Sequence, residues 1–274
     1  MIIVGLIWSN VTVKTSKYTI SDENIPEEFD GYTIVQISDL HNAEFGKDNE
    51  QLVKRIKKQE PNLIVLTGDI VDSNTDNFEK IKTFINKLSE IAPCYYVTGN
   101  HEAQFGKSRF NSLKETIEES GVCFLDNKVT EIHSDEDIIK ILGFEDPDVK
   151  GDILEVYTCE DVINSDYKYV KDNIDDEIGS SFTIALSHRP EAFESYVKNG
   201  INVVFTGHAH GGQFRVPFVG GLIAPGQGLF PKYDAGVYSK ENTHMVVSRG
   251  LGNSIIPIRI NNRPELVVVT LKKK

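Results

Sequence analysis

The feature that most constrains this chain is a series of strand-like runs that each end in metal-ligating residue types. The apolar run of residues 34–37 leads directly into Asp39 and His41. The pattern returns four times, at Gly68-Asp69-Ile70-Val71-Asp72, Gly99-Asn100-His101-Glu102, Ser187-His188 and Gly207-His208-Ala209-His210. Ligands of open α/β sheets bind beyond the carboxyl ends of the strands, so we expect these five strand ends to converge on one site.

The first half of the chain alternates between strand and helix patterns. Strands are predicted over residues 11–20, 32–38, 63–67 and 94–98, and helices over 49–59, 78–88 and 112–120, the last closed by Gly121. Strands and helices that alternate at short spacing from residue 32 to residue 125 predict a largely parallel sheet with crossover helices.

The second half has a different composition. Strands are predicted over 129–132, 138–144, 182–186 and 203–206, helices over 159–170 and 191–197, and β-hairpins in the Gly- and Pro-rich stretch 211–236. Residues 245–249, 255–260 and 266–271 are predicted as strands of a second sheet. We interpret the acidic region 145–178 as a solvated face or mobile flap, with a specificity insert as the alternative. One domain, 1–274, with two packed sheets accounts for the pattern.

Charge and cysteine content exclude several classes of protein. The net charge of −12 argues against a general nucleic-acid binder, whose affinity comes from Lys and Arg. An anionic substrate is still compatible, because bound cations reverse the local sign. Cys94, Cys123 and Cys159 are widely spaced and form no CxxC pair, which predicts free thiols and neither a disulfide framework nor a zinc–thiolate site.

The N-terminus leaves the question of membrane association open. Residues 2–8 are apolar, but a membrane span needs about 20 such residues, and the features of a signal peptide are missing. Residues 1–10 are interpreted as the remnant of an N-terminal anchor, a short strand or an apolar patch. Localisation is therefore predicted as membrane-associated or cytoplasmic.

The donor types at the strand ends indicate a dinuclear metal site. Carboxylate, imidazole and amide oxygen suit hard to borderline divalent ions. Two ions about 3.5–4 Å apart can clamp the attacking and leaving oxygens of a phosphoryl displacement. The strand ends offer Asp39, His41, Asp69, Asn100, His101, His188, His208 and His210 as candidate donors.

This ordered set resembles the calcineurin-like metallophosphoesterase superfamily, whose signature of Asp-x-His, Gly-Asp-x-x-Asp, Gly-Asn-His-Glu, a lone His and Gly-His-x-His is complete here. The tail, from Gly211 through residues 224–228 to Gly252, looks like the bacterial membrane-associated phosphodiesterase branch. The resemblance implies a four-layer α/β/β/α sandwich of two mixed sheets flanked by helices, and two divalent ions such as Mn, Zn or Fe.

The same resemblance implies a role for each ligand. Asp69 would bridge two ions, one held by Asp39, His41 and His210 and the other by Asn100, His188 and His208. His101 would stabilise charge on the leaving group or donate a proton to it, and Asp72 would orient His101 by a hydrogen bond. The nucleophile would be a hydroxide held by the metals, with no covalent enzyme intermediate.

The expected activity is hydrolysis of a phosphate ester, with a phosphodiester favoured and a small molecule or lipid as substrate. The alternatives are a UDP-sugar-lipid pyrophosphatase, a broad phosphomonoesterase, a nuclease and a non-catalytic metal-binding scaffold. The predicted interaction partner, apart from the substrate, is a membrane, with which the protein would associate through its N-terminus.

Other candidate residues have more ordinary interpretations. We expect His133 and His244 to be surface or packing histidines. Asn42 is predicted to be a turn residue or to touch substrate. Structural salt bridges are expected for Arg189, Arg215 and Arg249, and packed positions for Phe214, Phe218, Phe230 and Tyr233.

Overall fold

The computed structural model describes residues 10–149, 158–173, 175, 181–253 and 258–274. Within these residues, two six-stranded sheets pack face to face. The first has the order β1 (Lys14–Asp22), β16 (Glu265–Lys273), β2 (Thr33–Ile37), β3 (Leu63–Thr67), β4 (Cys94–Val97), β5 (Cys123–Phe124). The second has the order β14 (Gly236–Lys240), β15 (Thr243–Val247), β9 (Val203–Thr206), β8 (Thr183–Leu186), β7 (Asp137–Gly143), β6 (Lys128–Ser134).

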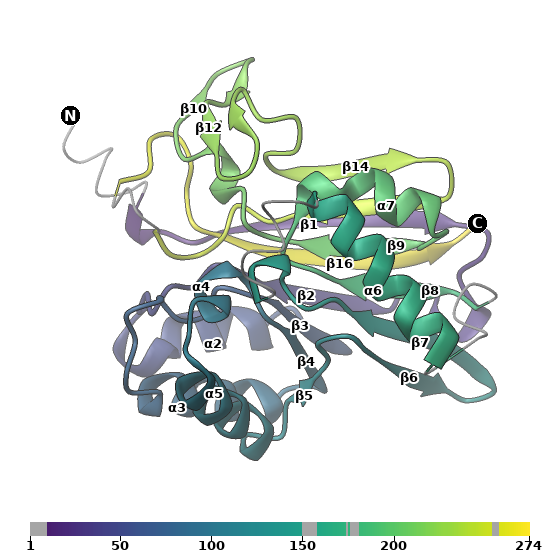
Figure 1. The fold of residues 1–274 in the computed structure, drawn as a ribbon, viewed down its shortest axis with the longest axis horizontal. Coiled ribbons are helices and arrows are strands. Elements are labelled where there is room, and N and C mark those ends of the chain that lie inside the picture. The colour runs from purple at the N-terminus through teal and green to yellow at the C-terminus, as the bar shows by residue number, and fades with distance from the viewer. Residues whose placement is uncertain (1–9, 150–157, 174, 176–180, 254–257) are drawn as a thin grey trace.

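Helices cover the outer face of each sheet, which confirms the four-layer α/β/β/α prediction (Figure 1). The first sheet carries α2 (Glu50–Lys57), α3 (Glu79–Ser89) and α5 (Lys107–Glu119), and the second carries α6 (Cys159–Asn173) and α7 (Phe193–Lys198). The short helix α4 (Asn100–Ala103) follows β4. Helix α5 begins five positions before its predicted start, because its first residues are too polar to show an apolar period.

The alternation of side chains along the strands explains the layers. In β2, Val35 and Ile37 pack under the helices of the first sheet, whereas Ile34 faces the second sheet. Successive side chains of a strand point to opposite faces, so a continuous apolar run serves two cores at once. On the second sheet, Ile184 and Ala185 divide in the same way between the central core and the core beneath α6 and α7.

Sequence patterns assigned one strand to the wrong sheet. Residues 266–271 were predicted in the second sheet, but β16 lies in the first, parallel to β1 and antiparallel to β2. Its local pattern gives no information about its partners. The predicted strand 255–260 falls largely outside the described residues. Ile260 is described, and it forms an isolated bridge with Phe214.

The stretch 211–236 forms the predicted hairpins, β10 (Arg215–Val216) with β11 (Gly220–Gly221) and β12 (Ile223–Ala224) with β13 (Gly228–Leu229). They project from one end of the molecule (Figure 1). Residues 1–9 lie outside the described residues. Among the residues that the structure describes, no helix has both the length and the apolarity needed to cross a bilayer.

Candidate metal centre

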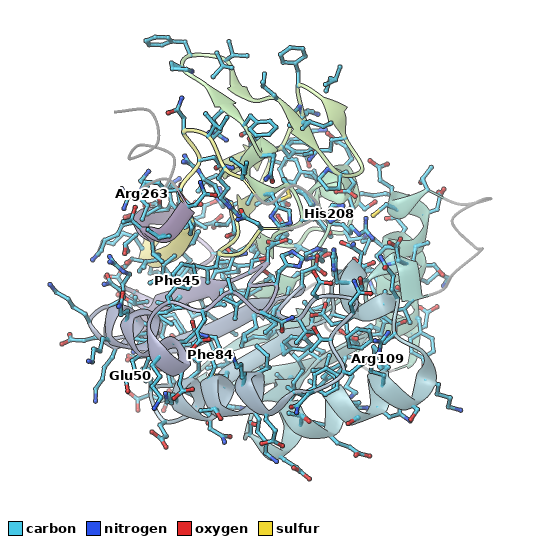
Figure 2. All side chains as sticks on the ribbon, turned by 90° about the vertical axis from the view of Figure 1, so that its left-hand side faces the viewer. Phe45, Glu50, Phe84, Arg109, His208 and Arg263 are labelled. Atoms are coloured by element: carbon cyan, nitrogen blue, oxygen red, sulfur yellow. The ribbon has the colours of Figure 1, made fainter. Side chains whose placement is uncertain are left out.

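The predicted ligands lie where strands from both sheets end. Asp39 and His41 follow β2, Asp69 follows β3, and Asn100 opens α4. From the second sheet, His188 follows β8, and His208 and His210 follow β9. Figure 2 shows His208 at the level where the hairpin region meets the lower half of the molecule. The site is therefore assembled at one edge of the interface between the two sheets.

A left-handed backbone turn aims most of these side chains. The φ angles lie between 46° and 65° at five of the seven predicted ligands, Asp39, His41, Asp69, His208 and His210. Non-glycine residues rarely adopt this conformation, and each costs on the order of 1–3 kcal/mol unless the surroundings enforce it. The fold thus concentrates backbone strain at this site, as is common where side chains must be held in place for function.

Two glycines allow the loops after β3 and β4 to approach each other. A Cβ on Gly68, whose φ is +82°, would lie 2.5 Å from the backbone nitrogen of Gly99. A Cβ on Gly99 would lie 2.3 Å from Oδ1 of Asp69. No side chain fits at either position, so the glycines of these two motifs are required by packing.

The donor atoms converge closely enough to share metal ions. One ligand atom from each of Asp39, His41, Asp69 and His210 falls within a group in which all atoms lie within 4.8 Å of one another. The Nε2 atoms of His41 and His210 are 3.2 Å apart, and Nε2 of His210 is 3.4 Å from Oδ1 of Asp39. These four side chains are all buried.

Asp69 stands between this group and the remaining donors. Its Oδ2 lies 3.6 Å from Nε2 of His41 and 3.3 Å from Nε2 of His188. His188 is in turn 3.2 Å from Oδ1 of Asn100, and its ring centroid is 5.0 Å from that of His208. All seven predicted ligands therefore lie in one connected cluster.

Hydrogen bonds fix the Asp69 carboxylate in this orientation. Its Oδ1 accepts the backbone N–H of His101 at 2.8 Å, which leaves Oδ2 facing the imidazoles. Glu102 holds the preceding loop, because its buried carboxylate accepts the backbone N–H groups of Gly99, Asp69, Ile70 and Val71 at 2.8–3.2 Å. Burial and the nearby Asp69 charge raise the pKa of Glu102 to about 7. This role of Glu102 was not predicted, although Glu102 is the last residue of the Gly-Asn-His-Glu motif.

The electrostatics of the cluster fit a cation site. Burial lowers the pKa of His41 well below its ordinary value and that of His210 to about 4, so both rings are neutral and present a lone pair. Burial would also lower the pKa of His188, but the carboxylates of Asp69 and Asp39 outweigh it and raise that pKa to about 10. An imidazolium thus supplies the positive charge that these two carboxylates require, and a divalent ion can take its place.

A buried arginine lies beside His208. Nη1 of Arg189 is 3.1 Å from Nε2 of His208 and donates to it, so the proton of the neutral ring lies on Nδ1, and an ion held by His208 would take over the Nε2 lone pair. Arg189 also donates to both oxygens of Asp146 at 2.7 Å and lies 2.8 Å from Asp148. The predicted salt bridge of Arg189 is confirmed, and its partners come from the start of the acidic region 145–178. Nothing local in the sequence connects positions 146 and 189, so the network was not predicted.

Arg259 occupies the corresponding position behind His210. It is fully buried, and its Nη2 lies 3.4 Å from Nδ1 of His210. Arg259 also donates to the backbone carbonyls of Arg249, at 2.7 Å, and of Gly252. Two buried guanidiniums thus orient the two histidines of the Gly-His-x-His motif. Arg259 was not predicted as a site residue, because it belongs to none of the motifs.

His101 lies at the edge of the cluster. Its Nε2 is 4.0 Å from Oδ2 of Asp69, and its ring packs edge-on against His41 with centroids 4.5 Å apart. Its Nδ1 accepts the backbone N–H of Ser73 at 3.2 Å, while the Asp72 carboxylate lies 3.9 Å from the same nitrogen. The role predicted for Asp72 as the hydrogen-bond partner of His101 stays a prediction.

A cavity of about 580 Å³ adjoins this side of the site. Asp72 and Asn42 line it, together with the carboxylates of Glu44, Asp48 and Glu79 and the single cation Lys80. Lys80 lies 3.3 Å from Glu44 and is paired with it. The described residues that line the cavity therefore carry a net negative charge. Asn42 donates to Thr75 at 2.6 Å, in keeping with the predicted turn role.

The remaining sequence interpretations have mixed outcomes. His133 and His244 lie on the surface side of the fold, near Glu131 and Asp22 respectively. Arg215 and Arg249 form the expected ion pairs, with Asp234 at 2.9 Å and Glu265 at 3.6 Å. All three cysteines are free, as predicted. The expectation of packed aromatics holds for Tyr233 but is wrong for Phe218 and Phe230, which are exposed. Phe218 lies in the turn between β10 and β11, and Phe230 directly follows β13.

Comparison with known proteins agrees with this geometry. Residues 32–212 match the model of the calcineurin-like phosphoesterase family. The chain belongs to this family. As a calcineurin-like phosphoesterase it is a metal-dependent enzyme, and its buried carboxylate and imidazole donors fit the divalent ions that the family implies.

Relatives of this phosphoesterase extend the match beyond the motifs. It is 32% identical to the uncharacterized metallophosphoesterase YkuE of Bacillus subtilis (strain 168), over 95% of this chain and 86% of YkuE. It is 28% identical to the phosphodiesterase YaeI of Escherichia coli (strain K12), over 88% of this chain and 82% of YaeI. Among solved structures, TT1561 of Thermus thermophilus has a TM-score of 0.54 at 13% identity, over 80% of this chain and 90% of that protein, which supports the fold alone.

Proposed function

We propose that this phosphoesterase hydrolyses phosphodiesters with two divalent ions, for which Mn, Zn and Fe are the candidates. The observation that carries the proposal is the position of Asp69 Oδ2, between His41 at 3.6 Å and His188 at 3.3 Å. One ion would be held by Asp39, His41 and His210. The other would be held by Asn100, His188 and His208, with Asp69 common to both. When bound, such ions lower the pKa of a nucleophilic water and neutralise charge on the phosphoryl oxygens.

The protein contributes preorganisation. The donors are fixed before substrate arrives by the left-handed turns, by the hydrogen bonds that Glu102 accepts from the backbone, and by the two buried arginines. Little reorganisation is therefore needed during the reaction. Burial keeps the local dielectric low, which strengthens every charge interaction in the site.

His101 acts in this proposal as a neutral hydrogen-bond donor to the leaving-group side of the phosphate. Because Ser73 N–H occupies its Nδ1, the ring proton lies on Nε2, the nitrogen nearest to Asp69. Nδ1 thus acts as an acceptor, and this contact supports charge stabilisation over proton donation. Substrates with different leaving groups distinguish proton donation from charge stabilisation. A proton donor helps alkyl leaving groups far more than nitrophenyl ones, whereas a charge stabiliser helps both.

The acidic cavity beside Asp72 supports a diester over a monoester. A diester carries one negative charge and a monoester close to two, and the carboxylates of Glu44, Asp48 and Glu79 repel the second charge. The similarity to the phosphodiesterase YaeI points the same way.

The test compares bis-p-nitrophenyl phosphate with p-nitrophenyl phosphate, using protein reconstituted with Mn²⁺, Zn²⁺ or Fe²⁺ and assayed for metal content. We expect the diester to have the larger kcat/KM. Preference for the monoester would instead favour the broad phosphomonoesterase. Activity confined to a UDP-sugar-lipid pyrophosphate would favour the pyrophosphatase. Full metal loading without activity on any phosphate ester would leave the non-catalytic scaffold.

A further inference from the structure

The two hairpins, residues 214–231, expose an unusual concentration of apolar side chains, and we call this region the hairpin projection. Among the described residues, six of the twelve exposed large hydrophobics fall within positions 216–230. Phe218 is fully exposed at 109%, Leu229 at 71% and Phe230 at 65%. Scattered apolar side chains are normal on a surface, whereas a contiguous group indicates an interaction site. Rings extend outward from this region at the top of Figure 2.

The projection is held rigidly with its apolar side chains outward. Asp234 accepts hydrogen bonds from Arg215 at 2.9 Å and from the backbone of Gly221 at 2.6 Å, which fixes the base of the first hairpin. Gln227 exchanges two hydrogen bonds with the backbone of Tyr233, at 2.8 and 2.9 Å, which closes the second. The exposure is therefore a property of an ordered structure.

The backbone at two of these exposed side chains provides a second, independent indication. Phe218 and Phe230 have φ angles of 68° and 54°. Glycine or asparagine is the usual residue in this conformation, and a bulky aromatic there is strained. Neither phenyl ring is buried within the fold, so intramolecular packing does not offset the strain. Backbone strain that is not offset by packing within the fold commonly marks a functional contact.

The charge around the projection distinguishes it from the rest of the protein. The chain has 41 acidic residues, but none occurs between positions 195 and 233. Within 199–233 the charged residues are Arg215, which pairs with Asp234, and the exposed Lys232. Although the net charge of the protein is −12, the projection itself contributes no carboxylate that phosphate-bearing headgroups would repel.

The start of the described chain lies beside the base of the projection. The side chain of Asn10 donates to the backbone carbonyl of Arg259 at 3.1 Å and accepts its N–H at 2.9 Å. The next residue, Ile260, bridges Phe214 and accepts the N–H of Arg215. The described chain therefore begins at the end of the fold from which the projection extends.

From these observations we propose that the hairpin projection docks on the surface of a lipid bilayer, with Phe218, Leu229 and Phe230 inserted among the headgroups. Exposed apolar side chains on a projecting element suit a fluid layer, which closes around them, whereas a folded protein partner would need a matching pocket. The projection continues directly from His210 through Gly211 and Gly212, so docking would hold the metal centre near the membrane surface. If the proposed function holds, amphiphilic phosphodiesters would reach the site from the bilayer.

The first test measures co-sedimentation of the full chain with vesicles of phosphatidylcholine, with and without phosphatidylglycerol. Phe218→Ser with Leu229→Ser should lower the vesicle partition coefficient at least about tenfold, because burying each side chain is worth roughly tenfold or more. The matched control is Ile138→Ser with Tyr169→Ser, which removes exposed apolar side chains at 38% and 55% far from the projection. The control should bind vesicles like the wild type. Both double variants should keep their Tm, since the replaced side chains are exposed.

The second test localises the contact. The chain has one tryptophan, Trp8, so Trp8→Phe combined with Phe218→Trp places a single fluorophore at the projection. Its emission should shift to the blue with vesicles and be quenched by brominated lipid. Sedimentation without that shift would overturn the proposal, as would full binding by Phe218→Ser with Leu229→Ser. A wild-type dimer that this variant converts to monomer, with no vesicle binding, would assign the projection to a second copy instead. None of these readouts depends on catalysis, so they stand apart from the proposed function.

Discussion

Gly99→Ala tests the link between the packing of two loops and the metal centre. The new Cβ would lie 2.3 Å from Oδ1 of Asp69 and 2.6 Å from its backbone nitrogen. Ordinary contact begins at 3.4 Å, so the carboxylate oxygen would have to retreat by 1.1 Å (3.4 minus 2.3) to restore it. The backbone of Gly99, with φ −113° and ψ −175°, is one that alanine adopts freely, so the effect comes from the contact itself.

A displacement of about 1 Å in a positioning group costs about 100-fold in rate, and we expect a fall of that order in kcat/KM for bis-p-nitrophenyl phosphate. Overpacking should also lower the free energy of unfolding by about 1–3 kcal/mol. Metal content measured after gel filtration should fall, because Asp69 contacts donors of both halves of the site.

Gly106→Ala is the matched control for this variant. Gly106 has an extended backbone, with φ −65° and ψ 154°, and a Cβ there meets no atom within 4 Å. Activity and metal content should match the wild type, with at most about 1 kcal/mol lost at the start of α5. A folded Gly99→Ala protein that keeps its metal and its turnover would refute the position assigned to Asp69.

Three further outcomes are expected. Asp69→Asn should abolish metal retention and turnover together, and loss of turnover with both ions retained would contradict a bridging role. His101→Ala should keep the metal but lower turnover about 100-fold, and undiminished turnover would remove His101 from the mechanism. In the metal-free protein the raised pKa of His188, about 10, means that the ion displaces a proton, so apparent affinity for Mn²⁺ should rise up to about tenfold per pH unit from pH 6.5 toward 10. Calorimetry in buffers of different ionisation enthalpy would measure that proton, and its absence would count against the charge balance. The same raised pKa stabilises the metal-free fold below pH 6.5, and this stabilisation is lost as the pH approaches 10.

Local sequence patterns were sufficient for the strands that carry the site. Residues 63–67 and 203–206 form β3 and β9 with the predicted bounds, because short buried runs flanked by Gly have few alternatives. The predicted ligands meet because parallel strands share their carboxyl edge. This argument needs no knowledge of side-chain contacts, and the distances around Asp69 agree with it.

What the sequence did not reveal depends on contacts between distant segments. The pairing of β16 with β1 and β2, and of Arg189 with Asp146, joins positions whose neighbours in sequence carry no sign of each other. The exposure of Phe218 could not be read from its hydrophobicity, because an aromatic at a hairpin turn and one in a core look alike in sequence. The position of Arg259 behind His210 could not be predicted either, because it also depends on a contact between distant segments.

The assembly of the donors from two separate sheets has a consequence beyond chemistry. Much of the contact between the two sheets is made by aliphatic side chains such as Ile34 and Ile184, whose contacts are not directional. Ions coordinated by Asp39 and Asp69 on one sheet and by His188 on the other would cross-link the two sheets at one edge of their interface. Chelation would then loosen that edge as well as stop turnover, and a cell starved of the metal would hold a protein more readily cut by proteases.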